Sequence, residues 1–360
     1  MRPVYRFDLL DGYRGIAALA VLLMHMLRAA GLEGAVQGAY LAVDLFFLMS
    51  GFVIARAYEQ KLLGGMTVRQ FMRIRLERLY PLIVLGALLG GAVGALNHDL
   101  LTTLTLTARA MFLVPTALHG QALPDWLITF NFAGWSLLWE LVVNLCYALL
   151  IRVMTGRILA LLIAISACMM AWQFQAYGWM NFGSTGGNGF AGLVRAEFGF
   201  FLGVALFRIR ESGRLLRLRV PTGPAVAALA AVLALSWPFP GLRWVDLVAV
   251  WVLFPLLVIS GINADVPARW ASVCRWLGAM SYPVYILQSA PSEFLRLLGH
   301  GYITGPPMAV AIAASMAMLT LLIAYAALKL VDEPIQHRLR TRREVAASAF
   351  AYAVPLSASN

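Results

Sequence analysis

Charged residues are scarce in this sequence: they make up 12% of its 360 residues, whereas hydrophobic residues make up 61%. Soluble domains are typically about 45–50% apolar and about 25% charged. A chain this poor in charge cannot cover a water-facing surface, and its mean hydropathy of +0.78 indicates that lipid solvates most of it. The composition therefore excludes an ordinary soluble enzyme or binding domain.

Acidic residues and cysteines are also few. The chain has 17 Asp and Glu against 28 Lys and Arg, which leaves a net charge of +11. A basic excess in short loops is attracted to anionic lipid headgroups, so we expect membrane lipids and no nucleic acid as partners. The three cysteines imply no disulfide framework, since two fall in expected helices and one in an expected loop. We expect no bound metal.

Long apolar runs dominate the rest of the chain. A helix that crosses a hydrocarbon core of about 30 Å needs about 20 apolar residues, and ten runs are long enough. The sequence therefore predicts an all-α, polytopic membrane protein with about ten transmembrane helices. The expected spans are approximately 13–31, 38–57, 80–97, 134–151, 158–177, 190–208, 222–240, 244–262, 276–298 and 306–330.

Basic residues predict the orientation of these spans. The segment 100–118 is apolar too, but its threonines, an arginine and a proline make it a weak span. If it does not cross, one face receives all but five of the 28 basic residues, as the positive-inside rule expects of the cytoplasm. Both termini are then cytoplasmic, residues 100–133 form a re-entrant or surface segment outside, and the protein lies in the cell inner (plasma) membrane.

One transmembrane domain is expected to occupy residues 1–335. Within it, residues 61–79 form the one clear amphipathic stretch, which we expect in the cytoplasmic interface. Residues 336–360 are expected to be a basic cytoplasmic tail, largely disordered because it is rich in Ala and Ser.

Ionisable residues inside the spans are candidate functional groups, because burying a charge in lipid costs several kcal/mol. Arg14 and His25 share one face of the first helix and lie about 16 Å apart along its axis. Asp44, Glu140 and Arg195 each enter their helices from the outer side, to depths near that of His25. Charge placement therefore predicts an outer cluster of His25, Asp44, Glu140 and Arg195.

A second cluster is predicted at the inner face, where Arg14 joins Arg75 and Arg78. Such a cluster would hold the phosphates of a donor by charge and by bidentate hydrogen bonds. In the outer cluster His25 could take a proton from an acceptor hydroxyl, with Asp44 or Glu140 fixing its tautomer. A cation or dipole beside it, such as Arg195, could stabilise an oxyanion.

Structural roles stay open for the same residues. His25 could be a packing residue, Arg75 and Arg78 could be interfacial anchors, and Glu140 could pair with Arg195. Ser50 and Gly51 could form a small-residue helix contact or line a donor channel.

Aromatic residues suggest where an acceptor would enter. The external segment 100–133, which includes Pro115, His119 and Trp126, would help to form an acceptor mouth. Trp126 and Trp135 could stack on sugar faces, although aromatic residues are common at this level of a membrane protein, and we favour a structural role for Trp135.

Seven segments in order along the chain carry a family pattern. They are LDGYRGIAALAVLLMH (10–25), VDLFFLMSGFVIA (43–55), RIRLERLYPL (73–82), FNFAGWSLLWE (130–140), RAEFGFFLG (195–203), LGAMSYPVYILQ (277–288) and DEP (332–334). In this order they resemble the motifs of the acyltransferase-3 family of membrane proteins.

The resemblance implies ten membrane helices, an acyl-coenzyme A donor at the cytoplasmic face, and transfer of a short acyl group, often acetyl, to a carbohydrate or lipid-linked hydroxyl on the far side. It marks Arg14 and His25 as the residues most expected to be essential. Two positions depart from the pattern: Ile74 precedes Arg75 where paired arginines are common, and Gln288 stands where many relatives have His. The chain resembles members without a fused esterase-like domain.

We therefore predict an inner-membrane O-acyltransferase that uses acetyl-coenzyme A, or another acyl-coenzyme A, as co-substrate and a glycan or lipid-linked acceptor as partner. A second copy and glycan-assembly proteins are further candidate partners. The predicted site residues are His25, Asp44 and Glu140 for catalysis, Arg14, Ser50, Arg73, Arg75 and Arg78 for donor binding, and Trp135, Ser136 and Arg195 for acceptor or oxyanion contacts.

Two other classes stay open. A proton-coupled secondary transporter or flippase of a glycan or lipid intermediate would also bury His, Asp, Glu and Arg as a proton relay. Transporters commonly contain related halves, and this sequence shows no internal repeat. A catalytically inactive glycan-binding scaffold would not require Arg14 and His25 on one helix face.

Overall fold

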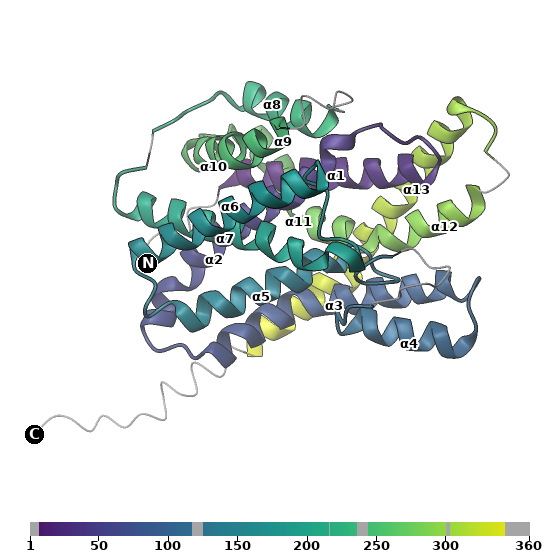
Figure 1. The fold of residues 1–360 in the computed structure, drawn as a ribbon, viewed down its shortest axis with the longest axis horizontal. Helices are drawn as coiled ribbons and strands as arrows, with labels where there is room; N and C mark the ends of the chain where they lie inside the picture. The colour runs from purple at the N-terminus through teal and green to yellow at the C-terminus, as the bar shows by residue number, and fades with distance from the viewer. Residues whose placement is uncertain (1–6, 117–124, 216, 236–243, 300–302, 343–360) are drawn as a thin grey trace, which may run out of the picture.

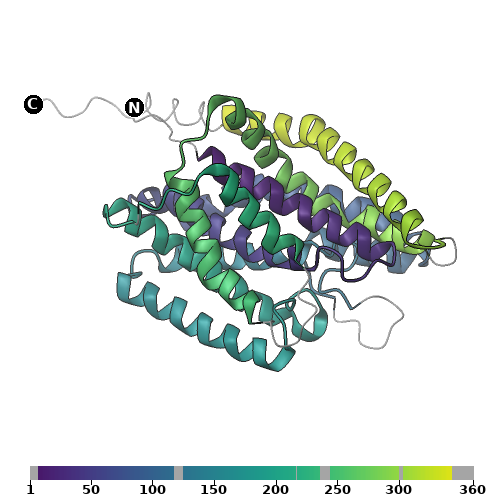
Figure 2. The ribbon, with the colours of Figure 1, turned by 90° about the horizontal axis from the view of Figure 1, so that it is seen from above.

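The structure is a computed structural model that describes residues 7–116, 125–215, 217–235, 244–299 and 303–342. Throughout these residues the regular structure is helical, which confirms the predicted all-α class. Most of the long helices run roughly along the long axis of the molecule (Figure 1). Figure 2 shows the yellow helix α13 along one edge of the bundle.

The chain order of the elements includes two 3₁₀ turns (η1, η2) and two π-helical turns (η4, η5). The bounds are α1 Asp8–Ala29, η1 Gln37–Leu41, α2 Ala42–Leu63, α3 Val68–Gly94, α4 Leu100–Met111, α5 Gly134–Leu150, α6 Gly156–Tyr177, η2 Gly186–Asn188, α7 Gly189–Glu211, α8 Thr222–Ala234, α9 Val245–Val248, η4 Ala249–Leu253, α10 Phe254–Asn263, α11 Ala268–Leu287, α12 Ser289–Gly299, α13 Pro306–Ala327 and η5 Leu328–Asp332.

Seven helical segments among the described residues are long and apolar enough to cross a membrane. Two shorter apolar helices, α5 and α8, have 17 and 13 residues. This supports a polytopic membrane protein. Ten spans and cytoplasmic termini stay predictions.

The expected span 276–298 is wrong as one helix. The structure has two: α11 begins earlier, at Ala268, and ends at Leu287, and α12 begins at Ser289. Pro291 explains the break, because it cannot donate a hydrogen bond to the carbonyl four residues back and its ring clashes with that carbonyl. At the break Gln288 donates its side-chain amide N–H to the Tyr285 carbonyl at 3.0 Å. The break places the end of α11 inside the bundle.

The amphipathic stretch 61–79 continues into the next expected span. Helix α3 begins after a reciprocal cap in which Thr67 and Gln70 each bond the other's backbone N–H, and it runs to Gly94. Pro81 removes one backbone N–H inside this helix. The carbonyl that it would have bonded, on Glu77, accepts a hydrogen bond from Gln336 at 3.0 Å. The arginines of this stretch are therefore fixed on a long helix of the bundle.

Two further expectations concern the segment 100–133 and the C-terminal tail. Helix α4 has 12 residues, fewer than a membrane-crossing helix needs, and packs beside α3 (Figure 1). A re-entrant or surface position for residues 100–133 stays a prediction. At its start the backbone N–H of Thr102 donates to Asp99, which lowers the pKa of that carboxyl. His119 lies outside the described residues. Residues 333–342 are helical, and the rest of the expected tail 336–360 lies outside the described residues.

Glycines bring α2 and α7 into backbone contact. A Cβ atom added at Gly51 would lie 1.9 Å from the carbonyl oxygen of Phe200, and one at Gly203 would lie 2.1 Å from that of Leu48. Small residues permit this close approach between membrane helices. Gly51 is therefore a helix contact, one of the two roles that the sequence left open for the Ser50-Gly51 pair.

We predict that Gly203→Ala destabilises the protein, because the new methyl group meets backbone that cannot move unless the two helices separate. Overpacking of this kind costs about 1–3 kcal/mol, which thermal unfolding in detergent micelles would detect. Gly223→Ala is the matched control, since a Cβ at Gly223 in α8 meets no atom within 4 Å. Equal melting temperatures for the two variants would contradict the close contact.

Candidate active site

A cavity of about 280 Å³ lies between α1, α2, α3, α5 and α11; we call it the basic cavity. Arg14 and Arg78 line one end, and their side chains are 36% and 39% exposed, so this end is open to the surface. Away from these arginines the lining is mostly apolar, and it includes the hydroxyl groups of Ser136 and Tyr285. Its lining residues are Arg14, Val43, Phe46, Phe47, Met49, Ser50, Val53, Ile54, Arg75, Arg78, Leu79, Ser136, Leu137, Glu140, Ser281, Tyr282 and Tyr285.

Glu140 belongs to this cavity. It accepts hydrogen bonds from Arg75 at 3.1 Å, from Asn144 at 3.1 Å and from the Ser50 hydroxyl. These bonds hold the Arg75 guanidinium in place at the cavity wall. The Nε of Arg75 is buried and has no hydrogen-bond partner among the described residues.

Carboxylates also lie near the other two arginines. Nη1 of Arg78 donates to both oxygens of Asp332 at 2.7 Å, and Asp11 lies 3.8 Å from Arg14. Because both bonds of Arg78 come from one nitrogen, its Nε and Nη2 keep their N–H groups. A guanidinium has five N–H donors, so each arginine can be neutralised by protein and still bind an anion.

Arg73, a predicted donor contact, lies away from this cavity. Its side chain is 78% exposed and pairs with Glu77 at 2.8 Å. Two residues on a helix differ by about 200° in direction, so Arg73 and Arg75 face opposite ways. The structure thus separates Arg73 from the other predicted donor-binding residues.

His25 lines a second cavity, of about 60 Å³, which we call the histidine cavity. Its ring packs on Phe132, with ring centroids 4.6 Å apart. No described side chain bonds to the imidazole nitrogens. The lining residues are Val21, Met24, His25, Arg28, Tyr40, Val43, Trp126, Phe132, Ala133, Trp135, Asn181, Ser184, Arg195, Tyr285 and Gln288.

The predicted outer cluster is therefore divided. Asp44 pairs with Arg195, and Glu140 pairs with Arg75 in the basic cavity, so neither carboxylate bonds His25. The physical reason is that both arginines lie within reach of these carboxylates and attract them more strongly than a neutral imidazole does. A pair between Glu140 and Arg195, the structural alternative, is also absent from the described contacts.

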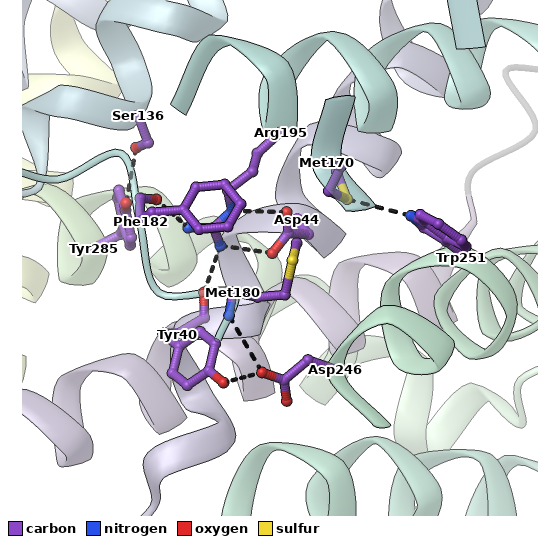
Figure 3. A network of polar contacts seen from close by, with 10 residues as sticks. All are labelled: Tyr40, Asp44, Ser136, Met170, Met180, Phe182, Arg195, Asp246, Trp251 and Tyr285. Carbon is purple, nitrogen blue, oxygen red and sulfur yellow. Dashed lines mark hydrogen bonds and ion pairs between the residues drawn. The ribbon is translucent and has the colours of Figure 1, made fainter. Parts of the chain in front are cut away.

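Arg195 is the centre of a buried network (Figure 3). Its side chain is 1% exposed, and it donates from Nε and Nη2 to the two oxygens of Asp44 at 3.0 and 2.6 Å. It also donates to the backbone carbonyls of Phe182 at 2.7 Å and Tyr40 at 3.1 Å. Four of its five N–H groups are used in this way, so its predicted contact with an oxyanion is left at most one donor.

Sequence reasoning missed Asp246, although it is the one acidic residue in its apolar run. It is 2% exposed and accepts hydrogen bonds from the Tyr40 hydroxyl and from the backbone of Met180. Figure 3 shows it next to the Arg195 network. It extends the network from α2 and α7 to α9.

Trp135 and Ser136, the other predicted acceptor contacts, lie at the start of α5. Trp135 is 7% exposed and packs edge-on against Phe47 and below the Arg195 guanidinium, an arrangement that fits the structural role favoured for it. Ser136 bonds the Tyr285 hydroxyl at 2.8 Å. Tyr285 lines both the basic and the histidine cavity. It lies in the segment 277–288 of the family pattern, but charge and hydropathy gave it no role.

A third, small cavity of about 30 Å³ adjoins the histidine cavity, and Trp126 and Phe132 line both. It also contains Asn97, His98 and Glu293. The three cavities thus follow one another through the bundle and share walls. No set of three or more His, Cys, Asp or Glu within the described ranges could hold a metal.

One family model matches most of the chain. The acyltransferase-3 family model, described as an acyltransferase domain, matches residues 7–329. Protein 2 in the picA locus of Rhizobium radiobacter is 38% identical over 183 residues, which cover 47% of this chain and 94% of that protein. Acyltransferase MdmB of Streptomyces mycarofaciens is 27% identical over 382 residues, which cover 95% of each chain. No solved structure matches.

We predict that Asp44→Asn strongly destabilises the protein, because it leaves the buried Arg195 charge without a counterion. Breaking a buried ion pair in this way costs about 3–5 kcal/mol. The control is Asp265→Asn, since Asp265 and its partner Arg219 are 81% and 73% exposed and exposed pairs contribute about 0–1 kcal/mol. Thermal unfolding in detergent micelles would measure both, and a small loss for Asp44→Asn would argue against the network.

Proposed function

Because this chain belongs to the acyltransferase-3 family, we propose that it is an O-acyltransferase that moves a short acyl group, such as acetyl, from acyl-coenzyme A to a hydroxyl group of a glycan or lipid-linked acceptor. The donor binds in the basic cavity and the acceptor reaches the histidine cavity. The observation that carries the proposal is that these two cavities share a wall, at Tyr285 and Val43.

The basic cavity suits coenzyme A at both ends. Arg14, Arg75 and Arg78 supply N–H donors for phosphates at the end that opens to the surface. The apolar walls accommodate the thioester arm, so that the acyl group lies at the deep end. Charge bias in the sequence supports a cytoplasmic donor side and an inner-membrane location.

The histidine cavity and the third cavity suit an acceptor hydroxyl. Trp126 lines both and offers an aromatic face, which can pack against the apolar face of a sugar ring. Asn97, His98 and Glu293 in the third cavity add hydrogen-bonding groups of the kind that bind hydroxyls. These features support a glycan acceptor.

His25 is the proposed general base. It takes the proton of the acceptor hydroxyl while the acceptor oxygen attacks the thioester carbonyl carbon. The C–S bond then breaks, and coenzyme A leaves as a thiolate that receives the proton. In this reaction Asp44 and Glu140 act through structure, because Asp44 fixes Arg195 and Glu140 fixes Arg75.

We predict that His25→Ala abolishes acyl transfer and keeps donor binding, since the base contributes to chemistry alone. General bases typically contribute about 10²- to 10⁴-fold. The purified protein in lipid would be incubated with radiolabelled acetyl-coenzyme A and a crude glycan fraction, and base-labile label on the glycan would be counted. His337→Ala, at an exposed histidine, is the control.

Each result of this experiment points in one direction. Label with wild type and His337→Ala but not with His25→Ala supports the proposed reaction. Equal label with all three proteins removes His25 from the mechanism. Movement of a glycan across the membrane without any labelling by wild type would favour the transporter.

We predict that Arg14→Ala weakens acyl-coenzyme A binding, whereas Arg73→Ala does not. Hydrogen bonds to charged groups contribute about 1.5–3 kcal/mol, which corresponds to roughly 10- to 100-fold in Kd. The two variants lose the same charge, but only Arg14 lines the basic cavity. Titration calorimetry with coenzyme A in detergent would test this, and equal losses would place the donor elsewhere.

A further inference from the structure

Tyr285 occupies the boundary between the two proposed substrate sites. Of the described lining residues, only Tyr285 and Val43 line both the basic cavity and the histidine cavity. Val43 has no polar side-chain atom, so the Tyr285 hydroxyl is the only side-chain hydrogen-bonding group common to the two linings. A carbonyl carbon of the donor that is attacked from the histidine cavity must lie next to this boundary.

The position of the ring is fixed on several sides. Tyr285 is 6% exposed, and its ring packs edge-on against Phe46, with centroids 5.5 Å apart. Its backbone carbonyl accepts a hydrogen bond from Gln288 at the break after α11. A ring held in this way has little freedom to turn its hydroxyl away from the boundary.

The direction of the hydrogen bond between Ser136 and Tyr285 follows from their partners. The Ser136 hydroxyl donates its one hydrogen to the carbonyl of Ala133 at 3.1 Å. With that hydrogen on Ala133, the bond of 2.8 Å between the two hydroxyls, drawn as a dashed line in Figure 3, uses the hydrogen of Tyr285. Tyr285 thus holds a donor hydrogen at the boundary, and Ser136 is the oxygen that accepts it at rest.

From this geometry we propose that the Tyr285 hydroxyl is the oxyanion donor of the acyl transfer, at a site for the thioester carbonyl. The proposal rests on the proposed function. When the acceptor oxygen bonds to the carbonyl carbon, the electron pair of the C=O bond moves onto the carbonyl oxygen. That oxygen accepts the Tyr285 hydrogen bond, and collapse re-forms C=O while the C–S bond breaks and the thiolate takes the proton from His25.

Other groups nearby fit this role less well. Ser136, a predicted oxyanion contact, lines the basic cavity but not the histidine cavity, and Arg195 lines only the histidine cavity and uses four of its five N–H groups in the buried network. Ser136 is then a positioning residue, which keeps the Tyr285 hydrogen directed along the cavity wall until the carbonyl arrives. Because the ring is already fixed at the boundary, only the O–H bond of Tyr285 has to turn from Ser136 to the carbonyl oxygen, and a donor that needs so little reorganisation is effective.

The test is Tyr285→Phe, which removes one oxygen atom and keeps the ring. Loss of one oxyanion donor typically lowers kcat by about 10²- to 10³-fold, and we expect this with the Kd for acyl-coenzyme A unchanged. Tyr80→Phe makes the same change at a ring that packs on Phe112 and lines none of the three cavities, and it should keep wild-type kcat.

A second variant guards against misfolding. Ser136→Ala keeps the Tyr285 hydroxyl and removes the atom that directs it, so kcat should fall by less than in Tyr285→Phe, again without a change in Kd. A purely structural role of the pair would lower the melting temperature and weaken donor binding along with kcat, and this result would overturn the proposal.

The outcomes separate this inference from the proposed function. Suppose that wild type transfers acyl groups and His25→Ala does not. If Tyr285→Phe and Ser136→Ala then both keep the wild-type kcat, Tyr285 is not the oxyanion donor, but the proposed acyltransferase function still holds. If wild type transfers no acyl group to any acceptor hydroxyl, the proposed function fails, and the inference fails with it.

Discussion

A buried arginine must be neutralised and hydrogen-bonded wherever a chain places it in a medium of low polarity, and Arg195 imposes this constraint on much of the structure. Its bonds tie α7 to Asp44 in α2 and to the backbone of Tyr40 and Phe182. The glycine contacts that let α2 and α7 touch bring the two partners within reach. Since α2 also lines both the basic cavity and the histidine cavity, the ion pair fixes the wall on which the proposed donor and acceptor sites depend.

The three cavity arginines show how one set of charges serves both stability and binding. Each has a carboxylate near it, from Asp11, Glu140 or Asp332, so a resting protein does not carry three uncompensated charges in its interior. A guanidinium keeps further N–H donors after such pairing, which a lysine ammonium would offer without a fixed direction. An anion that enters therefore finds oriented donors, and the carboxylates keep those donors in position when it leaves.

Hydropathy and charge were enough to predict the helical membrane class and to single out Arg14, Arg75 and Arg78, which share a cavity. They failed for Glu140, because depth counted along a helix does not reveal which neighbour a long side chain reaches; the answer depends on how α3 packs on α5. They failed for Arg73, since its direction follows from the phase of α3. Tyr285 lies in the segment 277–288 that carries part of the family pattern, but its hydroxyl had no assigned role, because a tyrosine in a span is ordinary until its hydroxyl is seen between two cavities.

The wall between the cavities bears on the chemistry as well as on binding. Water next to the activated carbonyl would compete with the acceptor hydroxyl, and apolar surroundings strengthen hydrogen bonds to a developing charge. Phe46, Val43 and the Tyr285 ring keep the deep end of the basic cavity apolar, while a single hydroxyl remains where charge would form. An acceptor hydroxyl beside His25 then has one nearby electrophile, so the same few side chains that separate the substrates also direct the transfer.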